Sequence, residues 1–338
     1  KFIAMKKLFI PVLLVLISVI GIASYALFIV ELPETMVYNS SEKNTIDDIT
    51  NFLPAPSTWE RGLAWAATIR RVKEIKPGRY SLQQGLTPWD AIALLRQGDN
   101  HIVLIRTDGS RKLNGFADAL STELAYTSEK YLRAFVEKMT GNSDINEKNI
   151  AIATTYLFAD TYDFRYTDTP EEIAMRFYKI NEEFWNQERR DKAKDIGLSL
   201  NEVYILASMV KGETKHFEEA PIIAGLYINR LKTPMKMQCD ATVAFANEED
   251  AGQRVSLNES KIKSPYNTYE VDGLPPGPIF ITEKKYIDAV LNYKKHNYIY
   301  MCAMDDGSGH HWFTSNSREH INNANRYHRY LDRLNIKE

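Results

Sequence analysis

The pattern of hydrophobic residues at the start of the chain predicts a helix that could cross a bilayer. Residues 8–30 (LFIPVLLVLISVIGIASYALFIV) carry no charge, and as a helix they would extend roughly 35 Å. Three lysines precede this run within residues 1–7, and two glutamates follow it by residue 34. This asymmetry places residues 1–7 in the cytoplasm and everything after residue 30 outside. A cleaved signal peptide is the alternative, because small residues stand at 23–26, but the length of the run favours an anchor.

The next hundred residues predict a small αβ unit. Residues 31–60 have the composition of an extended tether leading into a first helix. The alternation at 79–82 predicts a short strand, and 101–105 predicts another. Between them Thr87 is a good N-cap, with Pro88 at the first helical position. Nothing in this unit has catalytic spacing, so its simplest interpretation is a packing or binding module.

Longer apolar stripes and cap signals predict an α+β fold for the rest of the chain. Residues 113–140 are predicted to be mostly helical, and a helix is predicted from Thr169–Pro170 to about residue 185. Further helices are predicted after the capping box Ser199–Glu202, from Pro221 and after a cap at Thr282. Strands at 298–304 and 310–314 would form a hairpin around 305–309, followed by a last helix capped by Ser317. Between these helices, the three prolines of 272–278 require an irregular loop.

Composition excludes several classes of function. The formal net charge of −2 over 338 residues gives no basic field for nucleic acid. Cys239 and Cys302 are far apart and lack metal-type spacing, and the sequence leaves open whether they pair or stay free. His310 and His311 are adjacent, so in a strand they would point to opposite faces and could not bind one metal together. We therefore expect no metal and no cofactor.

One carboxylate stands out in LASMVKGETK, residues 206–215. On a helical wheel Glu213 falls on the same arc as Leu206 and Met209. It also occupies the last turn, where the helix dipole disfavours an anion. Both effects would raise its pKa, as a general acid requires near neutral pH. The alternative is that Gly212 ends the helix and leaves Glu213 in solvent.

The surroundings of Glu213 in sequence do not settle its role. A two-carboxylate glycosidase needs a second acid, and the candidates are Glu218, Glu219 and Asp240. The first two are explained more simply as charges at a helix N-terminus. Amides, phenols and hydroxyls around Gln238 and residues 266–269 suit a polar, ring-shaped ligand such as a sugar. Two further acids, Asp160 and Asp163, lie among aromatic residues, where they could line a sugar site or could be surface acids at a packed corner.

Taken in order, several motifs resemble the MltG (YceG-like) family of membrane-anchored endolytic murein transglycosylases. The matching segments are YLFADTYDF (156–164), LASMVKGETK (206–215), INRLKTPMKMQCDATVAFA (228–246), SPYNTYEVDGLPPGPI (264–279) and DDGSGHHWFTSN (305–316). Together with the anchor and the early αβ unit, the likeness covers most of the chain.

The resemblance implies roles for individual residues. Glu213 matches the family's catalytic glutamate, the second acid of a pattern resembling E-K-E-T, although Lys211 and Gly212 replace the two residues before it. The usual Q-T-D-P-T appears as 238–242 with Cys239 and Ala241 substituted. The implied binding residues are Gln238, Asp240, Asn267, Thr268, Tyr269 and His311.

The resemblance also implies an architecture and a reaction. Residues 31–112 would be a tether and LysM-like module, 113–150 a helical connector, and 151–338 the catalytic domain, outside a bacterial inner membrane. The reaction would cleave the β-1,4 bond between N-acetylmuramic acid and N-acetylglucosamine without water and leave a 1,6-anhydro end, which would limit strand length. Peptidoglycan would be the substrate, with penicillin-binding and other cell-wall synthesis proteins as partners. The rivals are a muramidase that uses water and a non-catalytic peptidoglycan-binding scaffold.

Overall fold

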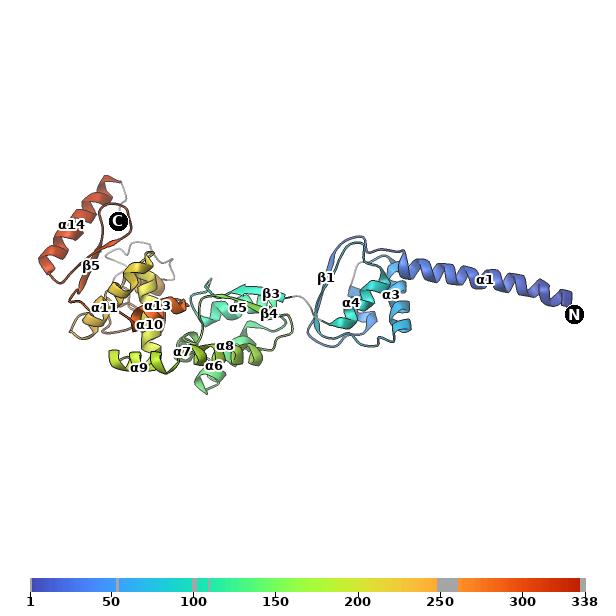
Figure 1. Ribbon diagram of the computed structural model, residues 1–338, viewed down its shortest axis with the longest axis horizontal. Helices are drawn as coiled ribbons and strands as arrows, with labels where there is room; N and C mark the ends of the chain where they lie inside the picture. Colours follow the sequence, from blue (N-terminus) through green and yellow to red (C-terminus); the bar gives the residue numbers. More distant parts are fainter. Residues whose placement is uncertain (1, 53–54, 99–101, 109, 248–260, 335–338) are drawn as a thin grey trace. The chain divides into compact units, whose positions relative to one another are not determined.

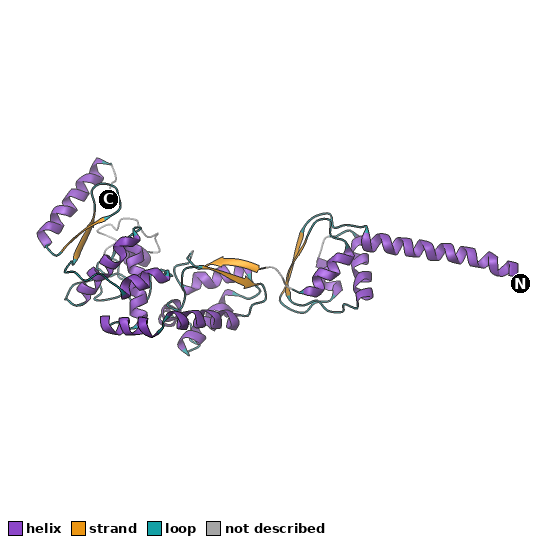
Figure 2. Cartoon of the chain, in the orientation of Figure 1, coloured by secondary structure: helices purple, strands orange, loops and turns teal. Residues whose placement is uncertain are grey.

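The computed structural model describes residues 2–52, 55–98, 102–108, 110–247 and 261–334, and it divides into two compact units. The first comprises the residues up to 104 with 121–126 and 163–169, and the second comprises the remainder. Both combine helices with short strands (Figures 1 and 2). The predicted mixture of α and β elements is therefore confirmed.

The apolar N-terminal run forms one continuous helix. α1 (Phe2–Phe28) includes Pro11 without interruption. Its stretch Ile10–Phe28 is long and apolar enough to span a membrane, and most of its side chains are exposed. At its end Ala26 and Leu27 are buried, and Gly62 of α3 packs so closely that an added Cβ would collide with the Ala26 carbonyl oxygen. The helix therefore has a free apolar surface along its length and a packed end.

The rest of the first unit encloses a core of its own. Its elements are β1 (Met36–Ser40), α2 (Ile46–Phe52), α3 (Ser57–Arg70), β2 (Gly78–Leu82) and α4 (Pro88–Gln97). α3 and α4 pack together (Figure 1), and Trp59 and Tyr80 are fully buried between these elements. The predicted strand at 79–82 is confirmed, and so is the Thr87 cap, whose side chain accepts from the Asp90 backbone N–H.

The expectation of an extended tether at 31–60 is wrong. β1 pairs antiparallel with β2, in the register Met36↔Leu82. Met36 and Tyr38 on its inner face are buried, as is Ile49 of α2. The segment MVYNS does not alternate apolar and polar residues, so its sequence does not predict a strand, and the partner strand lies about forty residues downstream. The segment is folded because pairing with β2 buries its inner face.

The second unit contains most of the helices. Three elements cross the boundary between the units: β3 (Ile102–Arg106), α5 (Leu113–Glu123) and β4 (Thr161–Arg165). The other elements of the second unit are α6 (Ser128–Thr140), α7 (Glu147–Thr154), α8 (Pro170–Phe184), α9 (Gln187–Ile196), α10 (Leu200–Glu213), the 3-10 turn η1 (Phe217–Glu219), α11 (Ala220–Leu231), α12 (Asp240–Ala246), α13 (Lys284–Leu291), β5 (Tyr300–Ala303), β6 (His311–Thr314) and α14 (Ser317–Arg333). β3 and β4 form a two-stranded sheet.

α10 is the central element of this unit. Ser199 and Glu202 form the predicted capping box at its start. Residues 203–210 of this helix are all buried, and α11, α12 and α13 pack around it. Such complete burial on every face removes the amphipathic contrast from the helix except at its ends. Its last turn is consequently the part that can reach solvent and ligand.

Two predicted helix caps are wrong. Thr282 does not cap α13, since Glu283 holds the N-cap position and no side chain bonds to that helix end. Thr282 instead forms a parallel bridge with Phe158, and its backbone N–H bonds to the Tyr204 hydroxyl. At α14 the cap is Asn316, whose side chain accepts from two backbone N–H groups, and Ser317 is the first helical residue. In both cases a neighbouring residue was already in the extended conformation that a cap requires.

The C-terminal hairpin has the predicted form. β5 and β6 pair antiparallel in the register Tyr300↔Thr314. α14 packs against both strands (Figure 1). On the other side, Met301 and Phe313 pack against the core around α10. The hairpin is thus held between α14 and the helical core.

Candidate active site

Glu213 opens into a cavity of about 510 Å³ in the second unit. Six parts of the chain form its wall: the end of α10, α11, the start of α12, the turn before α13, the hairpin and α14. The lining residues are Gly212, Glu213, Arg230, Gln238, Asp240, Ala241, Tyr269, Met301, Cys302, Ala303, His311, His320, Tyr327 and His328. Most of its surface is polar, as a carbohydrate ligand would require.

The helix places Glu213 at the cavity rather than in bulk solvent. α10 continues through Gly212 and ends at Glu213, so the alternative of an earlier helix end is wrong. Gly212 packs against α12, because a Cβ on it would lie 2.6 Å from the Cβ of Ala241. Thr214 then takes an extended conformation and turns the chain away. Glu213 therefore occupies the junction between a buried helix and the open cavity.

The environment of the Glu213 carboxyl raises its pKa. Burial among protein atoms is the largest cause, and the negative charge of Asp240 is the second. Three groups act in the opposite direction: the Cys239 thiol and the Tyr227 hydroxyl, which hydrogen-bond the carboxyl, and His311 through its charge. The Tyr227 hydroxyl donates to Oε1 at 2.6 Å. The predicted direction of the pKa shift is confirmed, and burial rather than the helix dipole is its main cause.

Gln238, Asp240 and Tyr269 stand together at one side of the cavity. Gln238 has a positive φ of 50°, an uncommon conformation for a residue other than glycine. Its backbone N–H bonds to the Thr268 carbonyl at 3.1 Å. Asp240 begins α12, and the Tyr269 hydroxyl donates to its Oδ1 at 2.5 Å. Two polar groups and one carboxylate are thus fixed beside Glu213.

Asn267 and Thr268 do not line the cavity. Both are fully buried behind it. Asn267 donates to the Ile262 carbonyl and accepts from the Tyr269 backbone N–H. Thr268 accepts from the Cys239 backbone N–H at 3.0 Å. These two residues therefore hold the backbone that carries Tyr269 and Gln238.

His311 reaches the cavity from β6 and is oriented by Glu219. One oxygen of the buried Glu219 carboxylate accepts from the His311 backbone N–H at 2.8 Å, and the other lies 2.9 Å from His311 Nδ1. Thr214, next to Glu213, also donates to Glu219. These bonds lower the pKa of Glu219 against the opposing effect of burial. Glu219 thus links Thr214 to His311 and is more than a charge at a helix N-terminus.

Several further residues of this site were not predicted from the sequence. Tyr227 and Arg230 lie on α11, and Tyr327 and His320 lie on α14. Arg230 donates to the carbonyls of Met237 and Ile299, at 2.5 and 2.7 Å. Arg230, His320 and Tyr327 line the cavity and Tyr227 bonds to Glu213, and all four take these positions through packing between helices. The i, i+3 pair of Tyr227 and Arg230 on one helix face was the available signal.

Two acids near β4 and Lys211 lie apart from the cavity, whereas Cys302 lines it. Asp160 and Asp163 are exposed at β4 and are not part of its lining. Lys211 pairs with Glu283 at 2.9 Å and donates to the Ile281 carbonyl. Cys239 and Cys302 are both free thiols. Burial raises the pKa of Cys239 well above its usual value, so it remains a protonated donor beside Glu213.

The hydroxyl of Tyr227 provides a direct test of how the site tunes Glu213. Its hydrogen bond lowers the pKa of that carboxyl, so Tyr227→Phe should raise the pKa further. In a plot of activity against pH, the alkaline limb, where a general acid loses its proton, is expected to move to higher pH. Initial rates between about pH 4 and pH 9 measure this. Tyr286→Phe, a buried phenol outside the lining, is the control, and an unmoved limb in Tyr227→Phe would contradict the assignment.

Comparison with known proteins identifies the family of this chain. The model of the YceG-like family matches residues 41–326, and the chain belongs to that family. An endolytic murein transglycosylase of Bacillus subtilis (strain 168) is 26% identical over 281 residues, which cover 79% of this chain and 77% of the relative. A protein of the same name from Streptococcus pneumoniae (strain D39) is 24% identical, and the match spans 84% of this chain but only 56% of that relative.

The fold also matches a solved structure. A crystal structure of a yceG-like protein from Listeria monocytogenes aligns with a TM-score of 0.55 at 22% sequence identity. The match covers 86% of this chain and 99% of that one.

Proposed function

We propose that this protein is an endolytic murein transglycosylase. It would cleave the β-1,4 bond between N-acetylmuramic acid and N-acetylglucosamine and leave a 1,6-anhydro end on the muramic acid. The observation that carries the proposal is the Glu213 carboxyl, which has a raised pKa, accepts from Tyr227 and opens into a polar cavity. The family membership and the names of the relatives support the same activity.

Glu213 would serve first as an acid and then as a base. In its protonated form it donates a proton to the glycosidic oxygen as the bond to C1 breaks. The carboxylate then takes the proton from the C6 hydroxyl of the muramoyl residue, whose oxygen closes onto C1. The Tyr227 hydroxyl would stabilise the transient carboxylate, since it donates to Oε1. The raised pKa suits the first step, and the hydrogen bond suits the second.

The polar groups beside Glu213 are proposed to hold the sugars. Gln238, Tyr269 and His311 line the cavity and would bond sugar hydroxyl and N-acetyl groups. Asn267 and Thr268 would act indirectly, since they hold the backbone under Tyr269 and Cys239. Asp240 would orient Tyr269 and, through its charge, keep Glu213 protonated.

One observation favours a second candidate, hydrolysis by a muramidase. Asp240 is a carboxylate in the same cavity as Glu213, and hydrolytic glycosidases use two such groups. The Tyr269 hydroxyl already occupies one oxygen of Asp240, which disfavours a role in activating water. Asp240→Asn separates the two mechanisms. If Asp240 activates water, the variant loses the base that hydrolysis needs, whereas in the transglycosylase it loses only a negative charge near Glu213.

The remaining parts of the chain are proposed to bring this site to nascent glycan. α1 would anchor the protein once in the bacterial cytoplasmic membrane, with the catalytic domain (151–338) outside. The module within 31–112 would be LysM-like and bind peptidoglycan, and residues 113–150 would connect it to the catalytic domain. Penicillin-binding proteins and other cell-wall synthesis proteins are the proposed partners.

Digestion of purified sacculi by the full-length protein tests the reaction. Released muropeptides are expected to carry 1,6-anhydro ends, and mass spectrometry shows each as one water lighter than the hydrolytic product. Products with reducing ends would establish the muramidase instead. Binding without any release would contradict both forms of the proposal.

A further inference from the structure

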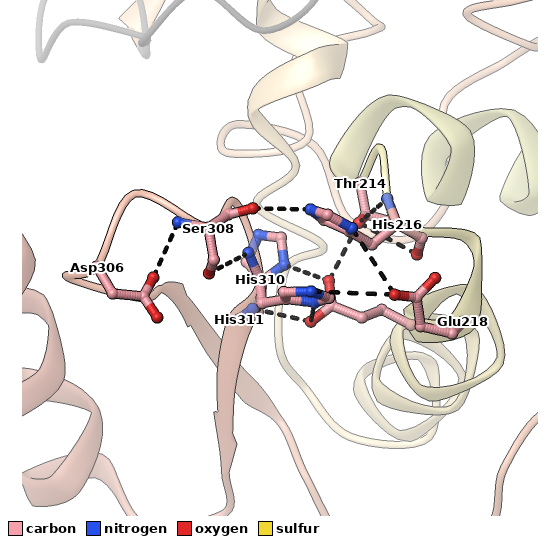
Figure 3. A network of polar contacts seen from close by, with 8 residues as sticks. Thr214, His216, Glu218, Asp306, Ser308, His310 and His311 are labelled. Carbon is pink, nitrogen blue, oxygen red and sulfur yellow. Dashed lines mark hydrogen bonds and ion pairs between the residues drawn. The ribbon is translucent and has the colours of Figure 1, made fainter.

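Three side chains form a cluster at the edge of the second unit, outside the lining of the Glu213 cavity (Figure 3). His216 follows α10, Glu218 belongs to η1, and His310 ends the turn of the hairpin. Oε1 of Glu218 lies 3.7 Å from His216 Nδ1 and 3.9 Å from His310 Nε2. One potential ligand atom from each residue lies within 4.8 Å of the other two. The two rings are stacked, with centroids 3.8 Å apart.

The second nitrogen of each ring already has an oxygen partner. His216 Nε2 lies 2.8 Å from the Ser308 carbonyl oxygen, which can only accept, so Nε2 carries the proton and Nδ1 has a free lone pair. His310 Nδ1 lies 3.3 Å from a carboxylate oxygen of the buried Glu219, which leaves the lone pair on Nε2. Metal-binding histidines are oriented in this way, with the distal N–H donated to a carbonyl or carboxylate.

We propose that His216, Glu218 and His310 bind a divalent transition-metal ion of the zinc class. Two neutral imidazoles and one carboxylate match the donors that zinc takes, with water in the fourth position. Calcium and magnesium prefer oxygen ligands alone and do not suit this set. Adjacent ligands around tetrahedral zinc are separated by about 3.4 Å, as bond lengths of about 2.1 Å require. The two stacked rings must turn so that both lone pairs face one ion, and the exposed Glu218 can move to meet it.

The proposed site would fasten the hairpin to the segment that follows α10. His310 comes from one side of this junction, and His216 and Glu218 come from the other. Glu219, which holds His310, also bonds to the backbone and the ring of His311 in the cavity wall. A bound ion would therefore fix the position of His311 without contacting substrate. This inference is independent of the reaction proposed above.

Titration of the metal-free full-length protein in detergent with Co²⁺ tests the site, because tetrahedral cobalt has strong visible absorption bands. Wild type is expected to bind one Co²⁺ per chain with these bands, and Zn²⁺ should displace it. Glu218→Gln and His216→Ala should weaken binding by at least about tenfold. Asp306→Asn is the matched control, since it removes a carboxylate from the same turn but none of the three ligands.

The outcomes are distinguishable. Bands that persist in both ligand variants, or that are absent from wild type, would overturn the proposal. Hydrogen exchange gives a second readout, because Zn²⁺ should slow exchange of the backbone N–H groups of 305–311 in wild type and in Asp306→Asn but not in Glu218→Gln. Glu218 is exposed, so its replacement by glutamine leaves the fold intact and the comparison valid.

Discussion

Replacing Glu213 with glutamine is expected to reduce release of muropeptides by about 10²–10⁴-fold, the usual contribution of a positioned general acid or base. The amide has nearly the same shape and still accepts from Tyr227, but it can neither donate a carboxylic proton nor take one. The rate is measured with full-length protein on purified sacculi. Glu183→Gln, an exposed acid on α8, is the control and should keep the wild-type rate.

The same variant should be at least as stable as wild type, which separates catalysis from folding. The pKa of Glu213 is higher in the folded protein than in the unfolded chain. The folded state therefore binds this proton more tightly, and stability declines as the pH rises above about 4.5 through the folded pKa. Glutamine has no such dependence, so the difference in melting midpoint should grow in favour of Glu213→Gln from pH 5 to pH 8. A fully active variant would remove Glu213 from the mechanism.

Gly212→Ala is expected to reduce activity by about 10²-fold, because an added Cβ at 2.6 Å from the Ala241 Cβ pushes α12 away from α10. α12 carries Asp240, and the residue before its N-cap is Gln238. A displacement of about 1 Å at a site can cost about this factor. Stability should fall less, since overpacking costs about 1–3 kcal/mol while alanine gains about 1 kcal/mol in helix propensity.

A double-mutant cycle tests this steric explanation directly. Ala241→Gly removes the opposing methyl group, so the double variant should recover most of the activity. In unfolding experiments the two substitutions are expected to interact by about 0.5–3 kcal/mol, so that the double variant is more stable than the sum of the single variants predicts. Additive losses would mean that the effect of Gly212→Ala comes from elsewhere.

Much of the local structure could be predicted from the sequence. The apolar run of α1, the capping box at Ser199 and the Thr87 cap depend on residues within a few positions of each other. The errors arose where distant segments compete with local signals. β1 has no apolar–polar alternation and is a strand only because it pairs with β2. Thr282 is a residue type that often caps helices, but here it forms a bridge with Phe158, and its backbone N–H bonds to Tyr204.

The candidate site also has some features that local sequence predicts and others that depend on distant segments. Helical periodicity alone placed Glu213 at the end of α10 on an apolar arc, and the family motifs selected it over Glu218 and Glu219. The tertiary structure decided which groups meet it: Tyr227 from α11, Cys239 and Asp240 from the start of α12, and the wall contributed by α14. It also brought His310 beside His216, whereas the sequence pattern had drawn attention only to the adjacent pair His310 and His311. The sequence by itself thus indicated which carboxylate could act as an acid, because apolar periodicity depends on near neighbours along the chain, but it left open whether the helix ends before Glu213. Only the tertiary structure decided its pKa and its cavity, because desolvation depends on side chains that are far apart in sequence and meet only when the helices pack.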